Sequence, residues 1–261
     1  MSDLEEALTL RPTDGGWMAF SDPRYEALNA MFGGWTAAVT LGATLKSANN
    51  GTRPSAMTIN FVDRVEPGIK LHLRTRSVGG SRSVQHYVTE MSRADDARTL
   101  AVATVVLTNR RDTDGHTQPS MPDAPDPELL EEFHPPGREG ERVMVRPITG
   151  AGPGKRASTT STAWVREMTG RRVDHLQLAF LADQFEPRSF FWSEGPRPSA
   201  TLCLSVYFLC TDEELEGVGD DYVLSEATGS RGVRSTSAQQ ARIWSRSGVL
   251  LATSEQLCWY R

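Results

Sequence analysis

The chain has 261 residues, enough for one large domain or two small ones. Hydrophobic residues make up 38% of it and charged residues 23%, and the formal net charge of −5 argues against a general nucleic-acid-binding protein. No stretch approaches the roughly 18 uncharged apolar residues that a membrane span needs, so we expect no membrane span.

The N-terminus and the cysteines indicate the compartment. The first residues, MSDLEEALTLRP, lack the basic start and apolar run of a signal peptide. Cys203, Cys210 and Cys258 lie in apolar surroundings without a CxxC spacing, so we expect buried free thiols and no metal site. A cytoplasmic protein without a cofactor is therefore expected, and the glycosylation sequon at 50–52 is expected to be idle.

The first half of the chain predicts one buried helix followed by strands. Residues 32–46, FGGWTAAVTLGATLK, carry no charge before Lys46, which is typical of a helix buried on every side. Several of the stretches that follow alternate apolar and polar residues, as half-buried antiparallel strands do. The predicted strands are 55–63, 69–77, 84–92 and 99–108.

A proline-rich and charged segment divides the chain. Six prolines fall within the segment, at positions 119, 122, 125, 127, 135 and 136. Such a composition is poor core material and is typical of a connection. We therefore predict a linker over 110–141 between two segments of similar size, 1–109 and 142–261.

The second half repeats the order of the first. Residues 174–187, DHLQLAFLADQFEP, predict a helix that is stopped by Pro187, with Asp174 at its N-cap. Strands are predicted after it at 200–209, 221–228, 233–245 and 248–259. The halves also share short sequences: PSA recurs 144 residues apart, while GSR and an Ala-Thr pair recur 149 residues apart. We therefore predict an internal duplication of an α+β unit, in which two sheets join edge to edge and cover each other's open edges.

In its motifs the chain resembles the double hot-dog acyl-CoA thioesterases of the acyl-CoA thioesterase II type. The resemblance covers nearly the whole chain apart from the linker. Its motifs, in order, are FGGWTAA at 32–38, VEPG at 65–68, VMVRPI at 143–148, TAWVRE at 162–167, FLADQF at 180–185, SATLCLSVYF at 199–208 and GVLLATSEQ at 248–256.

The resemblance implies two tandem hot-dog repeats, each an antiparallel sheet wrapped around a buried central helix. It also implies hydrolysis of acyl-CoA thioesters by one catalytic trio in the second repeat, Asp183, Thr201 and Gln256. Cys203 and Leu204 stand where the family often has Asp-His, and Trp35 replaces a Gln that often follows the paired glycines.

The repeat offers an internal control for this trio. At the offsets of 144 and 149, Val39, Met57 and Leu107 take the places of Asp183, Thr201 and Gln256. One copy thus carries polar residues where the other carries apolar ones. Each polar residue alone is more often an ordinary surface or strand residue, and only the three together favour a functional site.

The expected chemistry is direct hydrolysis. Asp183 would accept a proton from a water that is held with Thr201 and Gln256, since burial and a helix C-terminus both raise the pKa of a carboxyl group. The amides of Gly33 and Gly34 at a helix N-terminus are candidates to hold the oxyanion, with Trp35 beside the substrate. The CoA phosphates have candidates in Arg82, Lys155, Arg156 and Arg231, although solvated surface charge is the commoner role of such residues.

Other functions remain open or are excluded. A non-catalytic acyl-CoA or lipid-binding protein of the same fold is one alternative, and a thioesterase acting on acyl-carrier protein is another. Association into a homo-oligomer is also open. Residues 150–156, GAGPGKR, lack the spacing of a P-loop, and the chain has no GxSxG nucleophile elbow.

Overall fold

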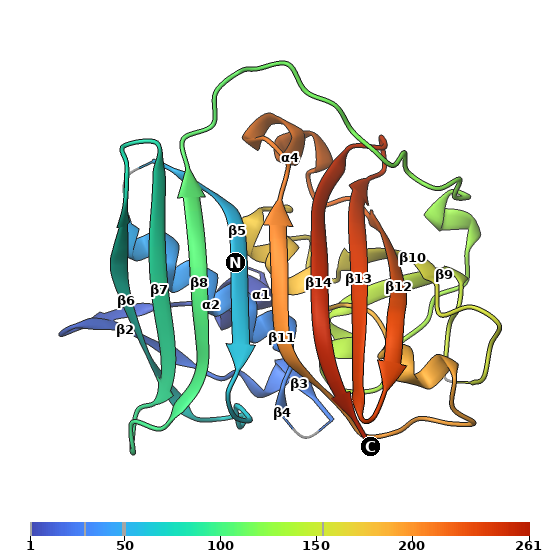
Figure 1. Cartoon of the computed structure of the whole chain (residues 1–261), viewed down its shortest axis with the longest axis horizontal. Helices are drawn as coiled ribbons and strands as arrows, with labels where there is room; N and C mark the ends of the chain where they lie inside the picture. The colour runs from blue at the N-terminus through green and yellow to red at the C-terminus, as the bar shows by residue number, and fades with distance from the viewer. Residues whose placement is uncertain (1, 29, 49–50, 153) are drawn as a thin grey trace.

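The computed structural model describes residues 2–28, 30–48, 51–152 and 154–261. Asn50 of the sequon and Pro153 of the 150–156 segment lie outside these ranges. The architecture is α+β, and it is dominated by one antiparallel sheet of 12 strands with few helices (Figure 1). The strand order is β1-β2-β6-β7-β8-β5-β11-β14-β13-β12-β10-β9.

The strands predicted from alternation are all present. Their bounds are Arg53–Phe61 (β5), Lys70–Gly80 (β6), Val84–Arg93 (β7), Thr99–Thr108 (β8), Ser199–Phe208 (β11), Val223–Val233 (β12), Thr236–Ser245 (β13) and Leu250–Tyr260 (β14). The sheet is extended at both edges by strands that were not predicted as elements: Arg11–Thr13 (β1), Gly16–Phe20 (β2), Val143–Thr149 (β9) and Ser161–Glu167 (β10). A two-stranded hairpin, Glu26–Ala27 (β3) and Ala30–Met31 (β4), stands apart from this sheet.

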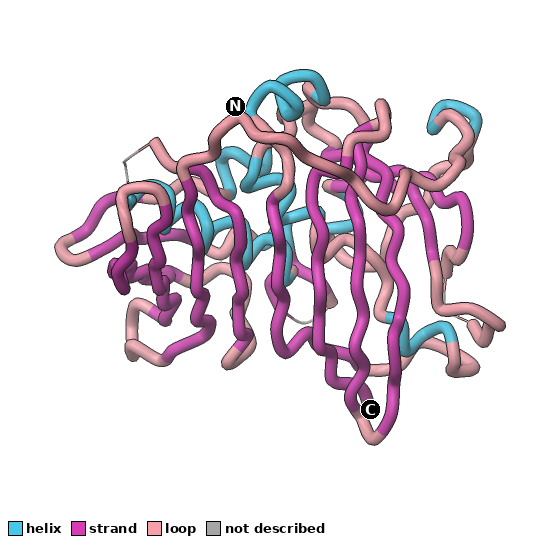
Figure 2. Tube along the Cα trace, turned by 45° about the horizontal axis from the view of Figure 1, so that its top comes forward, coloured by secondary structure: helices cyan, strands magenta, loops and turns pink. Residues whose placement is uncertain are grey.

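The helix predicted in the first half is α2, Gly33–Ala48, and its residues 34–44 are all buried. Polar side chains tolerate this burial because they bond to their own helix. Thr36, Thr40 and Thr44 each donate to the carbonyl four residues earlier. The helix packs on β2, β5, β6, β7 and β8, so the first half of the sheet curves around it (Figure 2).

The helix predicted in the second half is shorter than expected. This helix, α3, is His175–Leu181, and the prediction was wrong for the residues that follow. Asp174 caps its start by accepting from the Gln177 backbone N–H at 2.9 Å, as the sequence predicts. Its end is fixed from the sheet, because Ser254 on β14 donates to the carbonyl of Ala182 at 3.1 Å. The other α-helices of the described ranges are Asp3–Ala7 (α1) and Asp212–Val218 (α4). Short 3-10 helices span Pro23–Tyr25, Pro127–Leu129, Glu139–Glu141 and Arg188–Phe191.

The two halves of the sheet meet at β5 and β11, which pair antiparallel from Cys203↔Asn60 to Tyr207↔Ala56. Thr58 and Ser205 share a hydrogen bond of 2.9 Å across this seam. One hydrophobic core continues behind it, where Phe32 and Phe180 meet edge to face at 5.2 Å. The connection after β8 runs over the strand ends to the far edge of the sheet (Figure 1).

Candidate active site

Asp183 lies two residues beyond the end of α3, in a turn where the Phe185 N–H donates to its carbonyl. This turn places the carboxylate against the start of α2. A Cβ atom on Gly33 would lie only 2.5 Å from Asp183 Oδ2, and the Gly34 backbone N–H donates to the carboxylate. A carboxylate at this position is favoured because the first amides of a helix lack partners within the helix.

Gln256 on β14 reaches the same carboxylate. Its Nε2 donates to Asp183 Oδ1 at 2.6 Å. Its Oε1 accepts from Nε2 of Gln239 on β13, also at 2.6 Å. Gln239 Oε1 in turn accepts from the Arg188 backbone N–H at 3.2 Å. The network fixes the orientation of both amides, so the NH₂ group of Gln256 points to Asp183.

Gln239 was missed by the sequence analysis, although a signal was present. It occupies an inward position of the alternating strand β13, where Ala241 and Ile243 are also buried. An inward polar residue on such a strand needs a partner, and that partner is Gln256.

Thr201 lies next to this pair without bonding to it. Its hydroxyl contacts Sγ of Cys258 at 3.9 Å, and Cys258 Sγ lies 3.6 Å from Gln256 Oε1. Within the ranges that the structure describes, no hydrogen bond joins Thr201 to Asp183. The structure therefore brings Asp183 and Gln256 into direct contact. The partly exposed Thr201 reaches this pair only through the Cys258 thiol.

Burial controls the proton affinity of Asp183. It raises the pKa of the carboxyl group to about 7, although the hydrogen bonds from Gln256 and Gly34 favour the charged form. The same burial raises the pKa of the Cys258 thiol to about 12, and the nearby Asp183 carboxylate adds to this shift. The thiol is therefore neutral, and Asp183 is the group at this position that titrates near neutral pH.

The residues at the start of α2 differ in the groups that they present to the candidate site. The Gly34 N–H is engaged by Asp183, while Gly33 approaches the carboxylate closely. Trp35 is fully buried, and its indole N–H donates to the carbonyl of Ala7 at 3.3 Å. The Trp35 indole therefore packs towards α1 in the core. Its side-chain contacts do not support the predicted contact of Trp35 with substrate.

The strand register corrects two of the equivalences predicted from the offsets. Leu202 is an extra residue where β11 pairs with β14, and Ser55 is an extra residue where β5 pairs with β8. When these two bulges are aligned, Thr201 corresponds to Pro54 rather than Met57, and Gln256 corresponds to Val105 rather than Leu107. Sequence offsets miss this because a bulge shifts the register within a strand. The counterparts are still apolar and buried.

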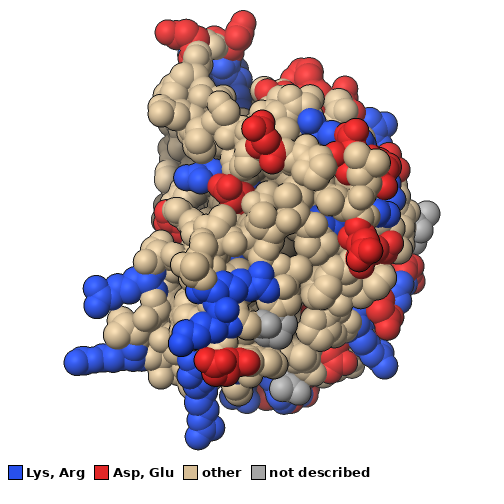
Figure 3. Space-filling model, turned by 90° about the vertical axis from the view of Figure 1, so that its right-hand side faces the viewer, with Lys and Arg blue, Asp and Glu red and all other residues tan. Residues whose placement is uncertain are grey.

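The basic residues considered for phosphate binding are surface groups. Lys155 lies 3.9 Å from Glu194, and Arg156 stacks on the Phe191 ring at 4.9 Å. Arg82 and Arg231 are exposed. Lys and Arg side chains gather on one part of the face that the C-terminal half presents in Figure 3.

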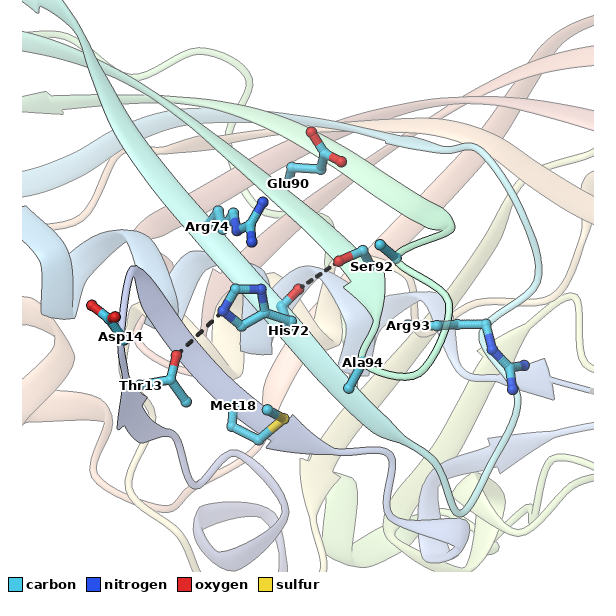
Figure 4. Close-up of a pocket in the computed structure, with 10 residues that line it drawn as sticks. Thr13, Asp14, Met18, His72, Arg74, Glu90, Ser92, Arg93 and Ala94 are labelled. Carbon is cyan, nitrogen blue, oxygen red and sulfur yellow. Dashed lines mark hydrogen bonds between the residues drawn. The ribbon is translucent and has the colours of Figure 1, made fainter.

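A surface pocket lies elsewhere, on the first half of the sheet (Figure 4). Its polar lining includes Thr13, His72, Arg74 and Glu90, and the Thr13 hydroxyl lies 3.2 Å from His72 Nε2. This pocket contains none of the predicted site residues.

Comparison with protein families decides the kinship. The family model of the acyl-CoA thioesterase C-terminal domain matches residues 113–260, and that of the acyl-CoA thioesterase N-terminal domain matches residues 21–108. The chain belongs to the acyl-CoA thioesterase family. No curated protein matches it significantly. None of the helices within the described ranges has the length and hydropathy of a membrane span.

Solved structures share the fold of this thioesterase-family chain. A conserved protein of unknown function with a hot dog fold from Alicyclobacillus acidocaldarius is 28% identical, with a TM-score of 0.95 over 100% of this chain and 98% of that one. The tesB protein from Mycobacterium avium subs paratuberculosis is 18% identical, with a TM-score of 0.80 over 99% and 98%. Acyl-CoA thioesterase II TesB2 from Mycobacterium marinum is 18% identical, with a TM-score of 0.75 over 99% and 98%.

Proposed function

We propose that the protein hydrolyses acyl-CoA thioesters to a free fatty acid and CoA, with Asp183 as the general base. The observation that carries the proposal is the Asp183–Gln256 hydrogen bond at the start of α2, in a member of the acyl-CoA thioesterase family. A partly buried carboxyl group whose pKa is about 7 suits a base that works near neutral pH.

In the proposed mechanism, Asp183 accepts a proton from the attacking water as that water adds to the thioester carbonyl. Gln256 orients the carboxylate through its fixed amide, and the Thr201 hydroxyl helps to hold the water. The thiolate then leaves as the tetrahedral intermediate collapses. A thiol with a pKa of roughly 8.5 leaves without strong acid assistance, and no cofactor or metal takes part in these steps.

The developing oxyanion needs hydrogen-bond donors. In this proposal Gly33 and Gly34 supply them from the first turn of α2, where negative charge is favoured. The Gly34 N–H serves the Asp183 carboxylate before substrate binds, so Gly33 is the first donor available to the oxyanion.

The chain divides into two repeats and a linker in this proposal. We assign residues 1–109 to an N-terminal hot-dog repeat around α2 and 142–261 to a C-terminal repeat around α3, with 110–141 as the linker. The edge-to-edge pairing of β5 and β11 and the family models for two domains support this assignment. A cytoplasmic location and a homo-oligomer remain part of the same proposal.

The test is release of free CoA thiol from a panel of acyl-CoA chain lengths. Wild-type protein is expected to turn over at least one chain length, and Asp183→Asn is expected to lose about 10²- to 10⁴-fold in kcat/KM because it removes the base. Asp95→Asn is the matched control, since that carboxylate lies in an exposed turn and pairs with Arg93.

Three results would contradict parts of the proposal. Equal turnover by wild type and Asp183→Asn would remove Asp183 from the mechanism and keep the thioesterase. Tight binding of acyl-CoA without turnover would indicate a binding protein. Turnover of acyl-carrier protein thioesters alone would change the substrate.

A further inference from the structure

Four arginines lie at one end of the second half and form a basic patch. They are Arg197 before β11, Arg231 and Arg234 at the turn between β12 and β13, and Arg261 after β14. Arg197 is partly buried, and the other three are exposed. None of the four forms an ion pair with any residue that the structure describes.

Contacts around Tyr260 hold the basic patch together. The Arg197 guanidinium lies over the Tyr260 ring at 4.8 Å, and its Nε donates to the carbonyl of Arg261 at 2.7 Å. The Tyr260 backbone N–H donates to the carbonyl of Ser235, in the turn between β12 and β13, at 3.0 Å. The patch therefore lies where β11 begins and β14 ends (Figure 1), and Figure 3 shows Lys and Arg side chains gathered towards this lower end.

At the same end of the first half, the arginines are neutralised. The turn between β7 and β8 lies at the lower end of the sheet in Figure 1, and its residues Arg93 and Arg98 pair with Asp95 and Asp63. A group of cations without such acids raises the local positive potential and attracts anions. The basic patch is therefore suited to an anionic ligand, although the formal net charge of the chain is −5.

The backbone of the turn between β12 and β13 points to a use for the charge of Arg234. Its central residues, Arg234 and Ser235, have φ angles of 49° and 66°. A two-residue turn of this kind favours Asn and Gly, because other side chains adopt positive φ only at a cost. The chain therefore carries an arginine at a position where a smaller neutral residue would fit the backbone better.

The distance from the candidate site to the basic patch matches the length of the pantetheine arm of CoA. Gln256, which bonds to Asp183, lies on β14 five residues before Arg261, and Thr201 lies on β11 four residues after Arg197. At about 3.4 Å per residue, these separations are roughly 17 Å and 14 Å. The arm joins the sulfur to the diphosphate through about 13 bonds, which span ~15 Å when extended, since three bonds of an extended peptide span ~3.5 Å.

We propose that the basic patch binds the phosphate groups of CoA, so that the nucleotide lies at the turn between β12 and β13 while the thioester lies at Asp183. The position of the thioester rests on the proposed function, whereas phosphate binding itself does not. Guanidinium groups suit this ligand because their planar N–H donors can bond two phosphate oxygens at once. CoA carries a diphosphate and a 3′-phosphate, so it can engage several of these arginines together.

The first experiment compares two substrates in one double variant, Arg231→Thr with Arg234→Asn, whose new residues suit a strand and this turn. With acyl-CoA, KM should rise roughly tenfold at unchanged kcat, because lost phosphate contacts weaken ground-state and transition-state binding alike. With the acyl-pantetheine thioester of the same chain length, which has no phosphate, KM should stay the same.

The matched control removes the same charge from another part of the sheet. Arg74→Thr with Arg76→Thr changes two exposed arginines of β6, in the first half. This double variant should keep the wild-type KM for both substrates, which separates a local phosphate site from an effect of net charge.

Calorimetric titration with free CoA measures the same site without turnover. The dissociation constant of CoA should rise roughly tenfold in the double variant of Arg231 and Arg234. In the wild type it should also rise with ionic strength, because salt screens charges that are exposed to solvent. The double variant should show a weaker dependence on salt, since two of the screened charges are gone.

An unchanged CoA affinity in the double variant of Arg231 and Arg234 would overturn the proposal. An equal rise in KM for acyl-pantetheine would overturn it too, because the effect would not depend on phosphate. A loss confined to acyl-carrier protein substrates would show instead that the basic patch docks an acidic protein. A protein that hydrolyses no acyl-CoA, but whose CoA binding weakens in the double variant, would support the phosphate site and remove the proposed function.

Discussion

The two halves of the sheet hold helices of different length, and the difference locates the candidate site. Helix α2 has 16 residues, carries no charge before its last turn and is buried along most of its length. Helix α3 has 7 residues and stops at Leu181. Because α3 is short, the chain leaving it can place Asp183 at the N-terminus of α2. One half thus supplies a helix start, and the other supplies the side chain that meets it.

The strands of the two halves also differ, in the polarity of the residues at corresponding positions. Aligned by their bulges, Pro54 and Val105 in the first half occupy the positions of Thr201 and Gln256 in the second. Gln239, Gln256 and Asp183 form a connected network. A polar residue in a core is tolerated where such partners exist, and the comparison predicts that a glutamine is not tolerated at the position of Val105 in the first half.

The largest expected effect is the pH dependence of activity, which tests whether the second half works through an ionised base. The pKa of Asp183 is raised to about 7, so kcat/KM should fall about tenfold for each pH unit below 7 and level off above it. Folding stability should change in the opposite direction. The charged form is disfavoured in the folded protein, so this group lowers the free energy of unfolding as the pH rises from about 3.8 to about 7.

The measurement is kcat/KM for one acyl-CoA from pH 5 to 9. A profile that is flat across this range would argue against Asp183 as the base. The residual activity of Asp183→Asn should lack the acidic limb, which separates titration of this group from general loss of structure.

Gly34→Ala tests the close approach of the two helices. A Cβ atom on Gly34 would overlap the carbonyl oxygen of Phe180 and the ring of Phe32, and backbone cannot move aside cheaply. We expect a loss of about 2–3 kcal/mol in the free energy of unfolding by urea. Gly42→Ala is the matched control in the same helix. Its Cβ would lie 3.5 Å from Leu10 Cδ1, an ordinary contact, so it should gain up to about 1 kcal/mol. Equal effects of the two changes would contradict this packing.

Val105→Gln tests whether the first half tolerates a buried amide at the position that corresponds to Gln256. Val105 is fully buried, and its register partners are Met57 on β5 and Tyr87 on β7, whereas Gln256 lies opposite Gln239 on β13. A glutamine there should cost about 1–3 kcal/mol of unfolding free energy, because its amide would be buried without partners. No gain in thioesterase activity is expected. A variant as stable as the wild type would show that the first half can accommodate an amide after all.

The smallest effect is expected for Gln239→Leu, which sharpens the role of the network. It removes the donor that orients Gln256, so kcat/KM should fall about tenfold, which corresponds to about 1.4 kcal/mol. Gln240→Leu, the next residue on the same strand and on its other face, serves as the control and should change activity less. Activity unchanged in Gln239→Leu would mean that Asp183 alone orients Gln256.

Local patterns predicted most of the elements. Alternation located the strands from β5 to β8 and from β11 to β14, and the uncharged run of 32–46 located α2. Patterns of a few residues failed at β1 and β2, whose short strands carry little periodicity. They also failed at the end of α3, where the chain turns at Asp183 before Pro187 is reached, held by Ser254 of a distant strand.

The candidate site divides in a similar way between sequence and tertiary structure. By itself the sequence determined most of the strands, the buried helix α2 and the kinship with thioesterases, because periodicity, composition and motifs are local properties of the chain. Only the tertiary structure decided that Asp183 meets Gly34 and Gln256, and that Trp35 turns towards α1. Those contacts join segments that are far apart in the chain. They depend on strand register, on bulges and on where a helix ends, which packing of the whole fold sets.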